Sequence, residues 1–174
     1  MKRNVNKLRL ILFEECHRNC DGCCNKDWDL PNLPVCRDFQ NYDSIMLTGG
    51  EPMLHPEVIV KAIGTIRMQT KAPIILYTSL VADKEMLGKI LDCIEGITVT
   101  LHTPEDITPF LEFDRYYAGN GNMSFRLNIF RGVGHVPVSP RWKVKDNITW
   151  IKDCPLPLGE TLMRFAPEDL QGKR

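Results

Sequence analysis

Short strand-like stretches alternate with amphipathic helical stretches along most of this chain. Six stretches are bounded by turn residues and are rich in apolar or β-branched residues; they are 8–13, 44–48, 73–78, 97–102, 124–130 and 147–152. Parallel strands need long crossover connections, which are usually helical. The alternation therefore predicts an α/β fold with a mostly parallel sheet.

Three stretches between the predicted strands have helical periodicity; they are 55–70, 83–96 and 108–117. The first and third carry a proline where the first helical turn would lie. The second begins at Asp83, a suitable N-cap, and we expect Gly96 to stop it. The stretch "DWDLPNLPVC" (27–36) is expected to be a loop, at a place where a crossover helix would normally lie.

The size of the chain limits the architecture further. The chain has 174 residues, of which 43% are apolar, so we expect a single domain over 1–174, with a core at about 8–152 and a C-terminal tail at 153–174. About six strands are too few for a closed eight-stranded barrel. An open, partial (β/α) barrel of about six mostly parallel strands is therefore predicted.

The charge balance argues against two classes of partner. Lys plus Arg and Asp plus Glu number 22 each, which leaves no global basic field for nucleic acid or an acidic membrane. The first apolar run ends at Glu14, too early for a signal sequence or a membrane span. We therefore expect a cytoplasmic protein with no membrane or nucleic-acid partner.

Four of the seven cysteines lie in "CHRNCDGCC", directly after the first predicted strand. In a reducing compartment, cysteines at this density suggest metal ligands and spare thiols rather than a disulfide framework. The C-x3-C-x2-C spacing of Cys16, Cys20 and Cys23 can supply three thiolates to a [4Fe-4S] cluster, which leaves one iron open. Cys24 is not expected to join them, because adjacent side chains of an extended chain point to opposite sides.

The second chemical motif is "TGGEP", Thr48–Pro52, at the end of the second predicted strand. Together, and in this order, the two motifs resemble the radical S-adenosylmethionine (SAM) superfamily. The resemblance implies that SAM chelates the open iron and is cleaved reductively to a 5'-deoxyadenosyl radical, which abstracts a substrate hydrogen. It also implies that Gly49, Gly50, Glu51 and Pro52 face the amino group of SAM.

The run from Cys16 through Asn25, Lys26 and Trp28 is also similar to the small activating enzymes of anaerobic ribonucleotide reductases. That similarity implies a glycyl-radical enzyme as partner and a reductant such as flavodoxin or ferredoxin. Two departures are Cys24, where that group usually has Tyr, and the added segment 124–152 with its proline-rich continuation. An alternative is a stand-alone enzyme that modifies a small molecule or peptide, in which case Asn25 and Trp28 are loop-packing residues.

Gly22 stands where many members of the superfamily have an aromatic residue near the adenine, so other residues must form the adenine wall. Candidates lie at the ends of later predicted strands; they are Tyr77, Thr78, Ser79, His102, Arg126 and Asn128. Ser79, His102 and Asn128 are the predicted cofactor-binding residues among them. Satisfying nearby backbone groups is an alternative role for each.

A non-catalytic module is the alternative of a different class. In that interpretation Cys24, His17 or another residue completes a structural zinc or iron–sulfur site with the other three cysteines. We expect Cys93 to be a small core residue beside a helical apolar face. Cys36 and Cys154 lie in proline-containing loops, where an exposed thiol could be a radical relay, an auxiliary ligand or a residue without a role.

Overall fold

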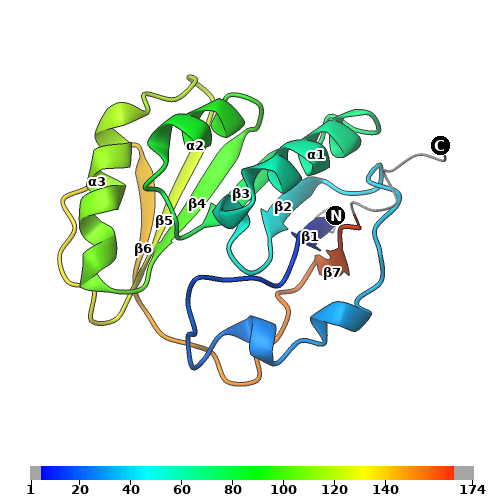
Figure 1. Cartoon of the computed structure of the whole chain (residues 1–174), viewed down its shortest axis with the longest axis horizontal. Helices are drawn as coiled ribbons and strands as arrows, with labels where there is room; N and C mark the ends of the chain where they lie inside the picture. Colours follow the sequence, from blue (N-terminus) through cyan, green and yellow to red (C-terminus); the bar gives the residue numbers. More distant parts are fainter. Residues whose placement is uncertain (1–4, 167–174) are drawn as a thin grey trace. The chain divides into compact units, whose positions relative to one another are not determined.

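The computed structural model describes residues 5–166 and has an α/β fold (Figure 1). Its strands are β1 (Lys7–Ile11), β2 (Ser44–Thr48), β3 (Ile74–Thr78), β4 (Gly96–Leu101), β5 (Ser124–Phe130), β6 (Trp142–Ile148) and β7 (Glu160–Arg164). The strands form an open sheet, in which hydrogen-bonded neighbours have the order β6-β5-β4-β3-β2-β1-β7. The predicted α/β class and open, mostly parallel sheet are confirmed. A radical SAM core stays a prediction.

The described residues form two compact units. One runs to Ile74 and resumes at Trp150, and the other is Ile75–Thr149. The expectation of a single domain over the whole chain stays a prediction, and its last residues, 167–174, lie outside the described part. Within that part, no helix is long and apolar enough to cross a membrane.

The first unit contains the parallel pairs β1–β2 and β1–β7. Its helix is α1 (Pro56–Arg67), and its short 3-10 turns are η1 (Cys24–Lys26), η2 (Leu30–Asn32) and η3 (Pro52–Leu54). The turns η1 and η2 are the only helical pieces between β1 and β2 in this described region. The expectation that 27–36 lacks a crossover helix is confirmed.

Buried aliphatic residues hold the strands and the helix of this unit together. Leu10 of β1 lies opposite Leu47 of β2, and both are fully buried. The helix α1 lies along β1 and β2 (Figure 1), and its buried side includes Ile59 and Ile66. Because β1 and β2 are parallel neighbours, the loops that follow them leave the sheet at the same edge. This arrangement places the two sequence motifs beside each other.

The stretch 160–164, expected to lie in the C-terminal tail, forms the strand β7 alongside β1. Glu160 lies opposite Lys7 and accepts hydrogen bonds from the Arg9 side chain, with Nε–Oε2 and Nη2–Oε2 distances of 2.9 Å. Arg164 donates its main-chain N–H to the Pro34 carbonyl and its side chain to Leu33. Charged residues on a short, half-buried edge strand gave no apolar pattern to detect.

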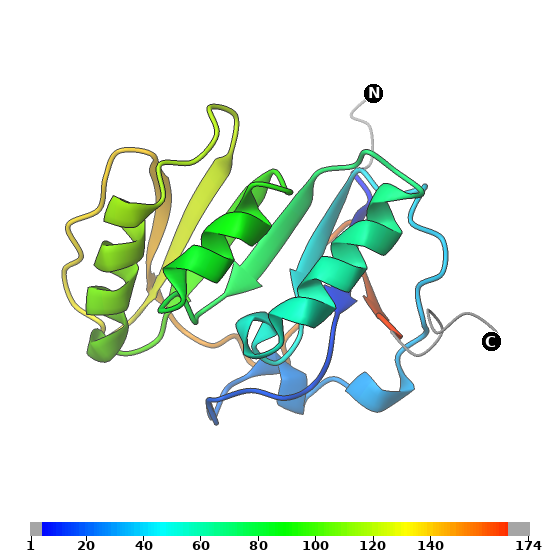
Figure 2. The same cartoon turned by 45° about the horizontal axis from the view of Figure 1, so that its top comes forward.

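The second unit contains the parallel pairs β3–β4, β4–β5 and β5–β6. Its helices are α2 (Lys84–Leu91) and α3 (Ile107–Tyr116), preceded by the turn η4 (Pro104–Asp106). Figure 2 shows α2 and α3 on the same face of β4 and β5. Phe110 and Phe113 of α3 are fully buried there.

Two boundaries in this unit differ from expectation. Asp83 caps α2 as predicted, accepting from the N–H of Met86, but the helix ends at Leu91 and Gly96 begins β4. The predicted strand 147–152 is wrong in most of its length, because β6 is Trp142–Ile148. All but the first and last residues of β6 are exposed. Its lysines are typical of an edge strand, and they interrupt the apolar pattern by which a strand is recognised in a sequence.

Candidate functional site

The loops after β1 and β2 are joined by main-chain hydrogen bonds. Leu12 N–H donates to the Thr48 carbonyl at 2.9 Å. Beyond the strand ends, the N–H groups of Gly50 and Glu51 donate to the carbonyls of Phe13 and Glu15, each at 2.8 Å. "TGGEP" therefore runs along the residues that lead into the cysteine loop, Cys16–Asn25.

The two glycines are required by this close approach. Gly49 has φ +147°, a conformation that residues with a Cβ rarely adopt, and a Cβ there would lie 2.6 Å from the Phe13 oxygen. A Cβ on Gly50 would overlap the Glu15 carbonyl. The backbone that approaches these glycines is that of the neighbouring loop, so the double glycine has a structural reason of its own.

Glu51 is almost completely buried, with 2% of its surface exposed. Its Oε1 accepts a hydrogen bond from the N–H of Met53 at 3.0 Å and so caps the turn η3. Pro52 is buried as the first residue of that turn. The carboxylate thus fixes its own loop by accepting from a backbone N–H. Accepting from an ammonium group is the other role that a carboxylate can have here.

The cysteine loop carries three free thiols in the predicted ligand positions. Cys16 is exposed, whereas Cys20 and Cys23 are half-buried. The N–H of Cys23 donates to the Cys20 carbonyl at 3.2 Å, which closes a turn between them. Partial burial raises the pKa of Cys20, and the nearby thiols of Cys23 and Cys16 raise it further, against the opposing charge of Arg18. Cys16 and Cys23 therefore lie near enough to Cys20 to influence its ionisation.

The donor set suits a soft metal centre, but its side chains are not gathered around one point. Within residues 5–166, no three His, Cys, Asp or Glu side chains have an arrangement that could hold a metal ion. Thiolates are the ligands of iron–sulfur clusters, and binding would displace the thiol protons. The cysteine loop thus fits a cluster in its chemistry, whereas ligation requires the three side chains to turn toward a common centre.

Asn25 connects the cysteine loop to the "TGGEP" loop. Its side-chain amide donates to the main-chain carbonyl of Gly49. The sequence pointed to Asn25 through the similarity to activating enzymes, with loop packing as its alternative role. The hydrogen bond gives this residue a direct structural role in the candidate site.

His55, which sequence reasoning left without a role, also lies at this junction. Its Nε2 is 2.6 Å from Oε2 of Glu15, and its ring meets the Phe13 ring edge-on with centroids 4.9 Å apart. The hydrogen bond with Glu15 raises the pKa of His55, and Glu57 adds to the effect. A pair separated by 40 residues leaves no local sequence signal.

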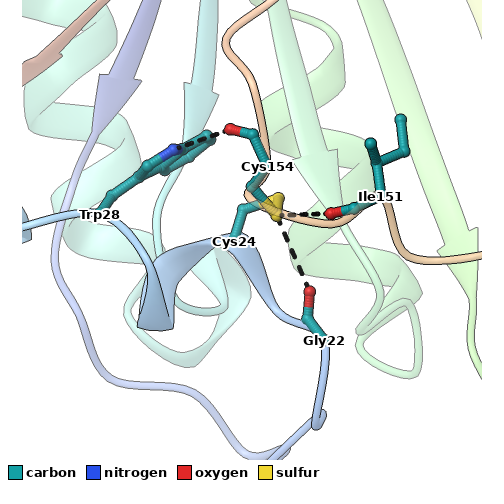
Figure 3. The surroundings of a disulfide bond; sticks show 5 residues. All are labelled: Gly22, Cys24, Trp28, Ile151 and Cys154. Carbon is teal, nitrogen blue, oxygen red and sulfur yellow. Dashed lines mark hydrogen bonds between the residues drawn. A yellow bond between two sulfur atoms is a disulfide. The ribbon is translucent and has the colours of Figure 1, made fainter.

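A disulfide joins Cys24 of the cysteine loop to Cys154, with the two Cα atoms 5.3 Å apart (Figure 3). The expectation that this chain carries spare thiols rather than disulfides is wrong for this pair. The bond also supports the expectation that Cys24 stays outside the ligand set. Trp28, whose indole N–H donates to the Cys154 carbonyl at 3.2 Å, packs beside the bond.

Residues 150–154, here called the clamp segment, lie against the cysteine loop. A Cβ on Gly22 would overlap the Trp150 side chain, so the missing side chain at position 22 makes room for this indole. The Cys154 sulfur lies 3.9 Å from the Gly22 carbonyl oxygen (Figure 3). The sequence did not predict this contact, because 128 residues separate Gly22 from Trp150.

The other predicted cofactor-binding residues belong to the second unit, at or near the carboxyl ends of β3, β4 and β5. His102 follows β4, donates its N–H to Asp106 and stacks on Phe130 with ring centroids 4.8 Å apart. Asn128 of β5 donates to the Thr100 hydroxyl at 3.5 Å. Ser79 directly follows β3. In these contacts the side chains of His102 and Asn128 meet other side chains, so both cofactor binding and the alternative role stay predictions.

The remaining candidates at these strand ends differ in exposure. Thr78 is buried and accepts from the N–H of Leu80 at 3.0 Å. Tyr77 is half-buried, and Arg126 is exposed.

The remaining cysteines correct one expectation. Cys93 is exposed rather than part of the core, and it lies beyond the end of α2 at Leu91. Cys36 is buried, and burial raises its pKa to about 11. Such a thiol stays protonated at neutral pH and is a poor nucleophile.

Comparison of the chain with models of protein families gives no match, and comparison with curated proteins gives none either.

Proposed function

We propose that this protein is a radical SAM enzyme, which binds a [4Fe-4S] cluster through Cys16, Cys20 and Cys23. The observation that carries the proposal is the junction of the two motif loops. The three free thiols follow β1, "TGGEP" follows β2, and hydrogen bonds from Gly50 and Glu51 hold the loops together. A ligand bound at one motif would therefore touch the other.

Each part of the junction has a role in the proposed reaction. The thiolates of the cysteine loop would hold three irons and leave one open for SAM. When bound, the reduced cluster would supply the electron for reductive cleavage of SAM to a 5'-deoxyadenosyl radical and methionine. Glu51 and the backbone of Gly49 and Gly50 keep the neighbouring loop in the position where an amino group of SAM could be received.

The substrate class is a further part of the proposal. The activating-enzyme similarity favours a glycyl-radical partner protein, with flavodoxin or ferredoxin as reductant, and a small molecule or peptide is the alternative. Asn25 and Trp28, which carry that similarity, each donate a side-chain hydrogen bond to a main-chain carbonyl of this chain. Their local roles serve either substrate equally, so the choice depends on experiment.

A partner assay separates the two substrate classes. With a candidate glycyl-radical enzyme from the same source, SAM and reductant under anaerobic conditions, an activase produces a doublet radical signal in electron paramagnetic resonance. Formation of 5'-deoxyadenosine with a small substrate, and no such signal, supports the stand-alone enzyme.

Iron content after anaerobic reconstitution tests the ligand assignment. Ala substitution of Cys16, Cys20 or Cys23 should abolish the cluster, because each supplies one of three thiolates. Cys93→Ala, which removes an exposed thiol in the other unit, is the matched control and should keep about four irons per chain. Retention of the cluster in Cys20→Ala would contradict the assignment.

The same preparation distinguishes the non-catalytic module. A zinc module binds a colourless metal tightly and lacks the broad visible absorption of sulfur-to-iron charge transfer. A structural zinc site needs a fourth protein ligand. While the disulfide is formed, Cys24 is not available for that role, and His17 remains a candidate.

A further inference from the structure

The clamp segment is attached to the cysteine loop by one covalent bond and by packing on both sides of it. Cys24 and Cys154 form the disulfide. Trp28 donates to the Cys154 carbonyl, and the Trp150 side chain fills the space above Gly22. All these contacts join residues 22–28 to residues 150–154, which are distant in sequence. The cysteine loop and the clamp segment thus form one local structure.

The clamp segment has a backbone conformation that depends on these contacts. Asp153 and Cys154 have φ values of +60° and +36°, in the left-handed region that residues with a Cβ rarely adopt. The N–H of Cys154 donates to the Ile151 carbonyl at 3.2 Å, which closes a tight turn. Such conformations persist where surrounding contacts hold them. Loss of the disulfide should therefore release the turn.

The disulfide also determines how many thiols the cysteine loop offers. Four cysteines lie in the loop, and the bond leaves Cys16, Cys20 and Cys23 free. Cleavage of the bond would add the Cys24 thiol directly beside Cys23. The number of free thiols in the loop then changes from three to four.

We propose that Cys24 and Cys154 form a reversible thiol–disulfide switch, which holds the clamp segment on the cysteine loop when oxidised and releases it when reduced. A low-molecular-weight disulfide closes the switch by exchange: one disulfide is consumed, the Cys24–Cys154 bond forms, and two small thiols leave with the two electrons and two protons. A small thiol in excess reverses the reaction. The consequence for metal binding rests on the proposed function: the closed form presents an ordered loop with three thiols.

Trypsin cleavage of the metal-free full-length protein tests the switch, because the clamp segment contains the exposed Lys152. The protein is equilibrated anaerobically in buffers of reduced and oxidised glutathione, and linked peptides are mapped by mass spectrometry. A Cys24–Cys154 peptide should form and disappear reversibly, and cleavage after Lys152 should be at least about tenfold slower when it is present.

Three variants control this experiment. Cys154→Ser should be cleaved rapidly in both buffers. Cys24→Ser removes the same bond and should give the same result, so it replaces Cys154→Ser if that variant does not fold. Cys93→Ser, which leaves the pair intact, should match the parent protein. The switch is overturned if the linked peptide is absent at every glutathione ratio, or if the rate of cleavage after Lys152 does not change with that ratio.

Cobalt(II) binding to the same metal-free proteins separates the switch from the proposed function. The oxidised parent protein should show thiolate-to-cobalt absorption and bind about fivefold more tightly than Cys24→Ser, which offers the same three loop thiols without the disulfide, because an ordered loop loses less freedom on binding. Equal cobalt affinity in the two proteins overturns the link between the clamp segment and metal binding by the cysteine loop. Absence of this absorption in every form contradicts the proposed metal site, while the Lys152 cleavage still decides the switch.

Discussion

The side chain of Asn25 donates a hydrogen bond to the main-chain carbonyl of Gly49, and so connects the cysteine loop after β1 to the glycine loop after β2. Gly49 is buried and Asn25 is half-buried, so water cannot easily replace this bond. The two motifs that suggest a cluster and a SAM site are therefore held together by the chain itself.

Replacing Asn25 with Ala should lower the free energy of unfolding by about 1–3 kcal/mol, because the Gly49 carbonyl is left without this donor in a buried place. Urea unfolding measures the change. Asn32→Ala is the matched control, since the Asn32 side chain is exposed and bonds only to the nearby Asp29 in the contacts described. Equal losses in the two variants would contradict a special role for Asn25.

Gly50→Ala and Gly64→Ala should change stability in opposite directions. A Cβ at position 50 would overlap the Glu15 carbonyl, and forced crowding of backbone costs about 1–3 kcal/mol. A Cβ at position 64, in α1, meets no atom within 4 Å. Ala at that exposed helical position should stabilise the protein by about 0.5–1 kcal/mol. Thermal unfolding of both variants checks the pair, and a stabilising Gly50→Ala would contradict the loop packing.

Much of the candidate site was predictable because both motifs directly follow buried strands. β2 and β5 have the predicted bounds, whereas β3 differs from expectation by one residue at one end and β1 and β4 differ by one or two residues at each end. Their apolar patterns come from burial within a parallel sheet. Once β1 and β2 pair in parallel, the cysteine loop and "TGGEP" must meet at one edge.

The parts that were not predicted depend on long-range contacts or exposed edges. The strands β6 and β7 are edge strands, and their polar residues mask the period of a strand. The Cys24–Cys154 bond crosses 130 residues, and spacing alone does not determine disulfide connectivity. The contact of Trp150 with Gly22 likewise exists only after the chain returns to the first unit.

Two substitutions of Glu51 should separate its structural role from its proposed role in binding SAM. Glu51→Gln keeps an oxygen that can accept from Met53, so stability should fall by less than about 1 kcal/mol. Loss of the charge should weaken SAM binding by roughly ten- to a hundredfold, since charge-assisted bonds contribute about 1.5–3 kcal/mol. Glu51→Ala should lose both, with the cap worth about 0.5–2 kcal/mol. Calorimetric titration with SAM and urea unfolding give the two values.

If Glu51→Gln binds SAM as tightly as the parent protein while its cluster is normal, Glu51 acts only on the loop. The proposed contact with the SAM amino group would then be withdrawn.

The pKa of His55 should be above its usual value in the metal-free protein, because Glu15 hydrogen bonds to the imidazole. A raised folded-state pKa means that the pair stabilises the protein fully below the unfolded-state value of about 6.5, and this contribution disappears as pH rises through the folded-state value. Glu15→Gln should return the pKa toward its usual value, and Glu57→Gln should lower it less. NMR titration of the imidazole measures all three. An identical His55 titration in Glu15→Gln would contradict the pairing.

Reductive cleavage of SAM is the most direct measurement of the central claim. The reconstituted protein is reduced with dithionite under anaerobic conditions in the presence of SAM, and 5'-deoxyadenosine and methionine are quantified by chromatography. The account predicts that both products form in equal amounts, that they form in Cys93→Ala, and that they do not form in Cys16→Ala, Cys20→Ala or Cys23→Ala. A protein that carries an intact, reducible cluster but forms neither product would contradict the assignment as a radical SAM enzyme.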